Sequence, residues 1–426
     1  MTLARFLLAN ALVCCCAGAW LCTPPALAFS LEEAMEAAAK HSLDAREDAL
    51  DVEQAEENRD LARAALIPTL NLSANLTMNE AEVAIGDRTV VNQFAYGANA
   101  GLTVTLFQGP LIPEFLASDS ALDAVRLNTA RSAGELRLLA AQLYFQALAA
   151  QRQLRASEES LAARKRHVQR IDALLQSGDR IEMDLARAKL AESEAQSQCI
   201  QAQSTLDELL DALAMLCQRE ALSADELQPA SLLANSAPQV LLPSESSADR
   251  ADLLALQATI ETTRWRTLAR SLALLPTVRL LAQYELSPPS FRSPDGMSWS
   301  IGLSLSWMLY DQTLWERIDL AEVEEQRAVL QRERAIDVVE RQQRSLARQL
   351  EESQAAVLVA EEALLTARRN RELAVALFED GALSIIELDD AEDELLSAEL
   401  RHSLALLQRE LLAIELLHNR GELDDA

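Results

Sequence analysis

The strongest constraint on the fold is that one pattern occurs twice along the chain. A helical run ends at Pro68, two alternating segments follow, and a very long helical run leads to a turn at Gly178. The same order starts again at Pro276 and leads to a turn at Gly381. The two prolines are 208 residues apart, whereas Phe107 and Tyr310, which follow the alternating segments, are 203 apart, as are the two glycines. The five-residue difference must lie in the loop between the alternating segments, where changes in length are tolerated.

The composition favours long helices over compact domains. Only 4% of the 426 residues are aromatic, the chain has 11 Gly and 12 Pro, and Ala, Leu, Glu, Arg and Gln dominate. Such a composition is typical of coiled coils and other long helices. The formal net charge of −28 argues against nucleic acid as a partner. It is compatible with an aqueous passage that carries cations better than anions.

Residues 1–28 are predicted to be a secretory signal. Arg5 provides the positive start, an apolar stretch follows, and Ala26–Ala28 is a small-x-small cleavage site before Phe29. A lipoprotein signal is the alternative because the segment contains four cysteines, but none of them combines a small residue just before it with a Leu-like residue further back. After this signal no run of 18 or more apolar residues occurs, so no transmembrane helix is predicted.

The chain after the signal keeps two cysteines, Cys199 and Cys217. They lie 18 residues apart in one predicted helix, which separates them by about 27 Å. A disulfide within that helix is therefore impossible. We predict two small buried side chains in preference to a metal or redox site.

Four segments alternate between apolar and polar residues, as amphipathic strands do. They cover about 69–77, 94–106, 277–286 and 298–309, and polar loops are predicted at 78–93 and 287–297. A tilted strand needs about 9–11 residues to cross a bilayer. One face is apolar and the other small and polar, as in a lipid-out, water-in barrel. A soluble hairpin packed on helices fits the alternation equally well. In a membrane, we expect Trp299, Trp307 and Tyr310 to lie near the two interfaces.

The strands and helices together predict a multimeric architecture. Four strands cannot close a barrel, and open strand edges are not allowed in lipid, so several chains must pool strands. Three chains would give 12 strands. Helices predicted at 115–176 and 314–379 would each span more than about 90 Å, long enough to reach across much of a periplasm. Shorter helices at about 182–220 and 384–420 return. A packing seam is predicted from apolar residues in the first long helix, namely Leu136, Leu139, Leu143, Leu148 and Leu154.

The resulting fold class is mainly α with a transmembrane β portion, built from a duplicated helix–β-hairpin–helix unit. The first helix is predicted to be continuous over residues 30–66. The predicted divisions are a signal (1–28), a first repeat (29–220), a linker (221–247), a second repeat (248–421) and a tail (422–426).

With this pattern the chain resembles the TolC family of outer-membrane efflux and secretion channels. The resemblance covers roughly Phe29 to Gly421. It is carried by the Phe-Ser-Leu-Glu-Glu-Ala run at Phe29, two helix-Pro-strand junctions, Leu106-Phe-Gln-Gly and the two glycine turns. It implies a homotrimer with a 12-stranded barrel in outer-membrane lipid above a periplasmic helical tunnel. It also implies docking to a periplasmic adaptor and an inner-membrane pump, with no bond made or broken.

The resemblance also indicates a pore entrance. In the family, acidic residues six and nine positions after the second turn form rings around the threefold axis, and Glu387 and Asp390 hold these positions here. Crowding of these carboxylates is expected to raise some of their pKa values and to attract cations. The family often has a basic latch residue where this chain has Leu383, so the latch is absent or has moved. A charged, solvated helix face is the plain alternative.

Two further features near the turns are candidates for contacts. In the first repeat, Asp184 is also expected at the pore entrance, and Asp184 or Arg180 is expected to contribute to contacts between helices there. The turns at Gly178 and Gly381 are predicted to dock the adaptor, although any helical hairpin needs such a turn.

The sequence gives no sign of an enzyme or of a cofactor. Its four histidines lack metal-ligand spacing, and it has neither a phosphate-binding glycine loop nor a nucleophile elbow. The rival to a channel is a periplasmic coiled-coil adaptor or structural protein without a pore.

Overall fold

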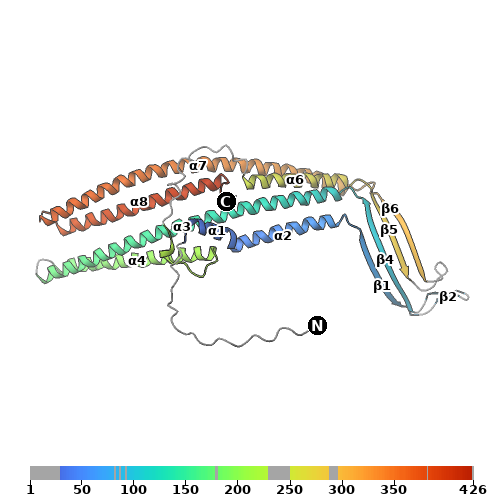
Figure 1. Ribbon diagram of the computed structural model, residues 1–426, viewed down its shortest axis with the longest axis horizontal. Coiled ribbons are helices and arrows are strands. Elements are labelled where there is room, and N and C mark those ends of the chain that lie inside the picture. Colours follow the sequence, from blue (N-terminus) through green and yellow to red (C-terminus); the bar gives the residue numbers. More distant parts are fainter. Residues whose placement is uncertain are drawn as a thin grey trace, which may run out of the picture.

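The computed structural model describes residues 29–80, 83–85, 88–91, 94–177, 181–228, 250–286, 296–380 and 382–424. These residues form an elongated molecule with a bundle of long helices at one end and a sheet at the other (Figure 1). The predicted signal, most of the predicted linker, and Gly178, Arg180 and Gly381 lie outside the described residues.

The first helix is divided, so the prediction of one continuous helix was wrong. Helix α1 covers Leu31–His41 and α2 covers Leu43–Ala64. Between them the backbone of Ser42 is extended, with ψ of 158°. The Ser42 hydroxyl accepts a hydrogen bond from the Ala45 N–H at 3.1 Å. Serine therefore caps the start of α2, which satisfies one of the backbone donors that every helix start leaves unpaired.

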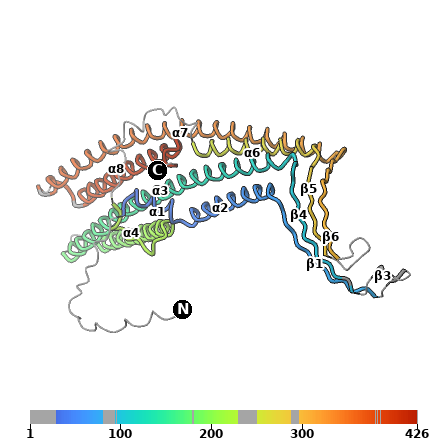
Figure 2. The backbone as a smooth tube through the Cα atoms, turned by 45° about the vertical axis from the view of Figure 1, so that its right-hand side comes forward, coloured from blue at the N-terminus to red at the C-terminus, as the bar shows by residue number. Residues whose placement is uncertain are grey.

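One sheet joins the two repeats. Strands β1 (Thr69–Met78), β4 (Phe94–Phe107), β5 (Thr277–Leu286) and β6 (Met297–Ser306) pair antiparallel in the order β1-β4-β5-β6. The β4–β5 pair links segments that are far apart in the sequence, and Figure 2 shows all four strands side by side. Strands β1 and β6 form the two edges.

The two β connections differ in length as the duplication predicts. The first covers 79–93 and the second 287–296, a difference of five residues. The first was predicted to be a plain loop, but it contains a small hairpin of β2 (Val83–Ile85) and β3 (Arg88–Val91).

Strand β6 ends at Ser306, three residues before the predicted end at residue 309. Its last pair joins Ser306 to Thr277, so the residue opposite Trp307 would be Pro276. Proline has no N–H to donate to a ladder. The Trp307 indole N–H instead donates to the Leu274 carbonyl at 3.0 Å.

The helical bundle is made of two long hairpins. Helix α3 (Leu111–Gln176, 66 residues) is followed by α4 (Glu182–Leu216), and α7 (Gln312–Glu379, 68 residues) by α8 (Ile385–Asn419). Helix α6 (Ala251–Leu272) enters the sheet in the second repeat. At 1.5 Å per residue, α3 and α7 are each about 100 Å long. The far ends of both hairpins lie opposite the sheet (Figure 1).

No helix in the described part of the chain is both long and apolar enough to cross a bilayer.

The hairpins pack along seams of small and aliphatic residues at seven-residue spacing. Buried examples are Ala188, Ala195 and Ala202 in α4, and Leu350, Val357 and Leu364 in α7. A seven-residue repeat is the pattern of a left-handed coiled coil. Of the seam residues predicted in α3, Leu136, Leu148 and Leu154 are buried and Leu143 is partly buried. Leu139 was wrongly included, since it is 42% exposed in the single chain.

The main core lies midway along the bundle, where chain segments converge on α3. Phe29 forms an isolated parallel bridge with Leu227, just after the short 3-10 helix η1 (Ala224–Glu226). The buried Tyr144 hydroxyl lies 2.9 Å from the Phe29 carbonyl and 2.8 Å from that of Gln228, and its single hydrogen is shared between them. Tyr144 thus fastens both segments to α3.

The two cysteines are free. The buried Cys217 thiol donates to the Ala34 carbonyl at 3.6 Å, and burial raises its pKa to about 11. Cys199 is only partly buried in α4, so the predicted burial is confirmed for Cys217 and was wrong for Cys199. A buried thiol that stays protonated acts as a packing side chain.

Candidate functional site: the sheet and the far ends of the helices

One face of the sheet is a continuous apolar surface. At one level the strand register places Leu72, Ala100, Tyr284 and Trp299 in a row across all four strands. Exposure of the large apolar side chains reaches 80% at Leu72 and 74% at Trp299. Others on this surface are Leu70, Leu76, Ile301, Leu303 and Leu305. An exposed apolar surface of this extent indicates contact with lipid or with another protein.

The opposite face is polar and closely fitted. The corresponding row contains Asn71, Gly101, Gln283 and Ser300. A Cβ atom placed on Gly101 would lie 2.5 Å from the Asn71 Oδ1 atom. The asparagine side chain therefore lies across the glycine, and a larger residue there would displace it. The two faces together match the amphipathic strands predicted from the alternation.

The three predicted interface aromatics are exposed and lie toward both ends of the strands. Trp299 is near the start of β6, on the loop side. Trp307 and Tyr310 follow the end of β6, where the chain returns to the helices, and they are 57% and 77% exposed. Their distribution fits two interfacial levels.

At the start of α8, Glu387 belongs to a capping box. The Ser384 N–H donates to a Glu387 carboxylate oxygen at 2.9 Å, and the Glu387 N–H donates to the Ser384 hydroxyl at 3.4 Å. These hydrogen bonds, first with the backbone and then with the side chain of Ser384, lower the pKa of Glu387. This lowering of the pKa within one chain is opposite in direction to the rise in pKa that we expected from the crowding of carboxylates at the entrance. Asp390 follows one turn later and is exposed.

The other predicted entrance residues lie at the same end of the bundle. Asp184 is in the first turn of α4 and is partly buried. Leu383 lies in the turn before α8, where its N–H donates to the Leu377 carbonyl at 3.2 Å. Leu383 therefore contributes a backbone contact and no charge to the turn.

Hydrogen bonds and ion pairs that no sequence pattern marks join α3 to α8 near this end. His167 Nδ1 lies 2.6 Å from an Asp389 carboxylate oxygen, and Arg170 lies 3.8 Å from the other. Arg164 pairs with Asp393 four residues further along α8. In the sequence, Asp389 and Asp393 cannot be told apart from the other acids of a charged helix face. Their partners are more than 220 residues away, so no local pattern could identify them.

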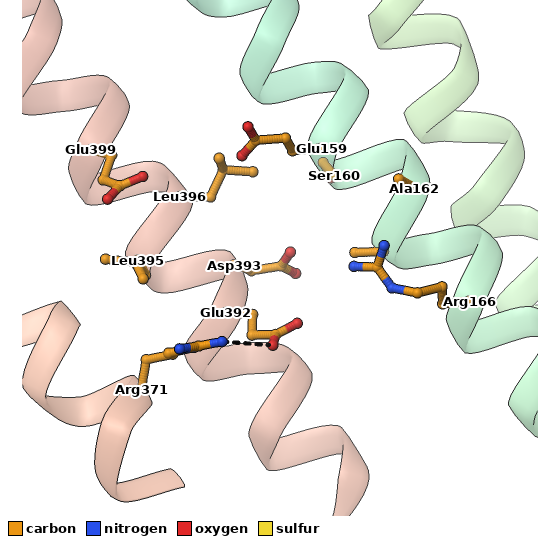
Figure 3. A pocket seen from close by; sticks show the side chains of 11 residues that line it. Glu159, Ser160, Ala162, Arg166, Arg371, Glu392, Asp393, Leu395, Leu396 and Glu399 are labelled. Atoms are coloured by element: carbon orange, nitrogen blue, oxygen red, sulfur yellow. Dashed lines mark ion pairs between the residues drawn. The ribbon is translucent and has the colours of Figure 1, made fainter. Parts of the chain in front are cut away.

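Beside these pairs, α3, α7 and α8 form a groove of mixed charge (Figure 3). Arg371 of α7 pairs with Glu392 of α8 at 3.9 Å, and Arg166 of α3 lies across the groove from them. Burial raises the pKa of Asp393; the neighbouring acids Asp389, Asp390 and Glu392 add to the rise, and Arg164 opposes it.

A second charged cluster lies where α8 ends, away from the hairpin ends. The Arg131 guanidinium donates to His418 Nε2 at 2.6 Å and to the Asp424 carboxylate at 3.4 Å. Arg250 forms a two-bond ion pair with Asp252 at 2.8 and 2.9 Å. Burial, together with the charges of Arg131 and Arg250, lowers the pKa of His418 to about 4. The cluster fastens α3, α6 and α8 together.

Within the described residues, no group of three or more His, Cys, Asp or Glu side chains is placed to hold a metal ion.

The comparisons with known proteins agree with this architecture. The model of the outer membrane efflux protein family matches residues 34–217 and again 242–418. No curated protein sequence matches the chain. The solved CmeC outer membrane channel of Campylobacter jejuni is similar in fold, with a TM-score of 0.79 at 16% identity over 92% of this chain and 85% of that one. VceC of Vibrio cholerae gives a TM-score of 0.72 at 17% identity, over 92% and 96%.

A third similar structure is the open state of the MtrE outer membrane channel of Neisseria gonorrhoeae. Its TM-score is 0.74 at 18% identity, over 92% of this chain and 88% of that one. Structures at this level of identity establish the fold alone. Membership of the family rests on the family model, which matches most of the chain. That match decides against the adaptor that the sequence analysis left open. The chain belongs to the outer membrane efflux protein family, a family of channels and not of enzymes, and is an outer-membrane exit duct whose helical part lies in the periplasm.

Proposed function

We propose that three copies of this chain form one passive duct, through which solutes delivered by an inner-membrane pump and a periplasmic adaptor leave the cell. The observation that carries the proposal is the four-stranded sheet, with one apolar and one polar face and with β1 and β6 as its edges. In lipid each edge needs a partner strand. Pairing β6 of one copy with β1 of the next gives a closed barrel of 12 strands from three copies.

The helices support the same assembly. Helix α2 has no buried residue, and its Leu43, Leu50 and Leu61 are each more than 60% exposed in the single chain. Apolar side chains lie exposed along α7 as well, at Leu320, Val323, Leu358 and Val359. Exposed apolar surface on long helices indicates interfaces with other chains. Neighbouring copies would cover these surfaces and complete a tunnel wall.

The far ends of the hairpins are the proposed entrance. Glu387 and Asp390 are three residues apart on α8, so they share a helix face. In a trimer they would bring six carboxylates near the axis, with Asp184 and Leu383 close to the same level. The turns at Gly178 and Gly381 are the proposed docking points for the adaptor. We also propose the division into a first repeat (29–220) and a second repeat (248–421).

The missing basic latch has a proposed replacement. Asp389 receives His167 and Arg170 from α3, and Asp393 receives Arg164. These contacts hold the second hairpin against the first. Partly exposed ion pairs contribute only about 0.2–1 kcal/mol each. Repeated in three copies, they would favour a closed entrance without locking it.

Membrane fractionation and mass measurement test this function. The protein is expected to remain with outer membranes after osmotic shock and to require detergent for extraction. Its mass after correction for bound detergent should be three times the mass of one mature chain. Release by osmotic shock without detergent, or a single-chain mass, would contradict the proposal.

A further inference from the structure

The polar face of the sheet carries a pair of charges whose role the proposed function does not explain. Of the 44 residues in β1, β4, β5 and β6, the charged ones are Arg279 and Glu285, both in β5. They are six residues apart, so they point to the same face, and they lie about 20 Å apart along the strand. One positive and one negative charge per chain therefore occupy two separate levels.

The strand register shows what surrounds each charge. Arg279 lies opposite Thr105 on β4 and Ser304 on β6, and Glu285 lies opposite Asn99 and Ser298. All four neighbours are uncharged. Both charged residues are exposed, and neither has an ion-pair partner among the residues that the structure describes. Each charge is thus free to act on whatever occupies the space in front of this face.

The two levels lie at opposite ends of the sheet. Arg279 is the third residue of β5 and follows Pro276, where the chain leaves the helices. Glu285 is the second-last residue of β5, next to the connection to β6. Figure 1 shows β5 starting beside the helical bundle and running away from it. Arg279 therefore marks the helical end of the sheet and Glu285 the loop end.

We propose that Arg279 is a specificity-determining residue that favours anionic groups, such as carboxylates and phosphates, at the inner end of the barrel. The proposal rests on the proposed trimer, in which three copies of Arg279 form a ring at the junction of barrel and tunnel. Glu285 forms a ring of the opposite sign near the outer mouth. The chain carries a net charge of −28, so the Arg279 ring would be positive within an assembly whose overall charge is strongly negative.

The effect should depend strongly on salt. The Debye length is about 30 Å at 0.01 M salt and about 3 Å at 1 M. At low salt the field of three guanidinium groups extends well into the lumen, whereas at 1 M it is confined to the wall. A dependence on salt therefore separates an electrostatic role from a steric one.

A thiol-reactivity experiment tests the proposal without an open periplasmic entrance, since reagents can enter from outside. Ser304→Cys places a thiol opposite Arg279. Its reaction with a sulfonate-bearing methanethiosulfonate is compared with its reaction with a trimethylammonium-bearing one, on the intact trimer in liposomes. Protein without the added cysteine gives the background from Cys199 and Cys217.

Adding Arg279→Gln to Ser304→Cys should lower the anion-to-cation rate ratio by about threefold or more at 0.01 M salt and hardly at all at 1 M. Arg279→Lys keeps the charge and should leave the ratio unchanged. Ser298→Cys, opposite Glu285, should show a rise in the same ratio with Glu285→Gln.

Two results would overturn the inference, and they are distinguishable. Normal reaction at Ser304→Cys with a ratio that does not respond to Arg279→Gln would remove the role of Arg279 and leave the duct intact. Failure of both reagents to react in membranes, although the denatured protein reacts, would show that this face does not line water and would contradict the proposed function as well.

Discussion

Ser384 and Glu387 cap the start of α8 reciprocally, each donating its backbone N–H to the side chain of the other. Glu387 therefore has a structural contact at the level proposed for the pore entrance. Glutamine at the same position of a capping box accepts the same backbone hydrogen bond. Replacing the carboxylate by an amide thus removes charge while α8 keeps its start.

The entrance residues are tested by cation block. Glu387→Gln combined with Asp390→Asn should weaken block by a trivalent cation at least tenfold, because six carboxylates per trimer are lost. The measurement is the cation concentration that halves the current through single channels. Glu351→Gln combined with Glu352→Gln removes the same charge from the middle of α7 and should leave the block unchanged. An unchanged block in the first variant would place the constriction elsewhere.

An arginine placed on the apolar face of the sheet tests whether this face meets lipid. Leu303→Arg should prevent membrane assembly, because a cation on the lipid-facing side of a strand costs about 2–4 kcal/mol at the bilayer midplane and occurs three times per trimer. Ser300→Arg, on the polar face of the same strand, is the matched control and should assemble. The measurement is the yield of trimer in outer membranes. Equal yields would show that the Leu303 face does not meet lipid.

Tyr144 is tested by deleting its hydroxyl. Tyr144→Phe leaves the carbonyls of Phe29 and Gln228 without that donor and should lower the free energy of unfolding by about 1–3 kcal/mol. Tyr310→Phe, at an exposed tyrosine, should change it by less than about 0.5 kcal/mol. Loss of helical circular dichroism in denaturant measures both. Equal midpoints would mean that the hydroxyl does not fasten the two segments.

The buried His418 predicts a loss of stability on acidification. Its folded pKa of about 4 lies below the unfolded value of 6.5, so between these values the unfolded chain binds the proton and the folded chain does not. Stability is therefore fully present above pH 6.5 and falls as the pH drops toward 4. A shift of this size corresponds to about 3 kcal/mol.

Other groups in the cluster respond differently, so a comparison of variants isolates His418. Burial raises the pKa of Asp424. As the pH falls, the folded chain therefore binds this proton before the unfolded chain does, and this binding adds stability where protonation of His418 removes it. Burial acts to raise the pKa of Asp252, but the hydrogen bond and charge of Arg250 lower it overall. The effect of Asp252 on stability is therefore confined to pH values below about 3.8. His418→Gln should flatten the decline in unfolding temperature between pH 7 and 5, whereas His402→Gln should not. A decline of the same slope in both variants would contradict the assignment.

The sheet could be predicted because its signals are local. Alternation of side chains marks β1, β4, β5 and β6, and the two prolines mark where β1 and β5 begin. The end of β6 could not be predicted, because it depends on the proline just before the neighbouring strand β5, where a partner for Trp307 would have to be. The hairpin of β2 and β3 is short and has no strong alternation, so its segment has the composition of a loop.

The candidate site was only partly predictable. The spacing of Glu387 and Asp390 after the turn is visible in the sequence, but the capping role of Glu387 was missed although Ser384 lies three residues before it, as a capping box requires. The α3–α8 ion pairs depend on how two hairpins pack, and no sequence pattern reports that register. The break at Ser42 had a local signal, a serine capable of capping, but the apolar pattern on both sides concealed it.

The most direct test of the duct is the single-channel conductance of detergent-purified trimer in a planar bilayer, with a trivalent cation added to one side and then to the other. A duct with an acidic entrance should give discrete, cation-selective steps that are blocked from one side only, the side of Glu387 and Asp390. Steps blocked equally from both sides would contradict an acidic entrance at one end. Protein that is monomeric without detergent and never conducts would contradict the duct itself.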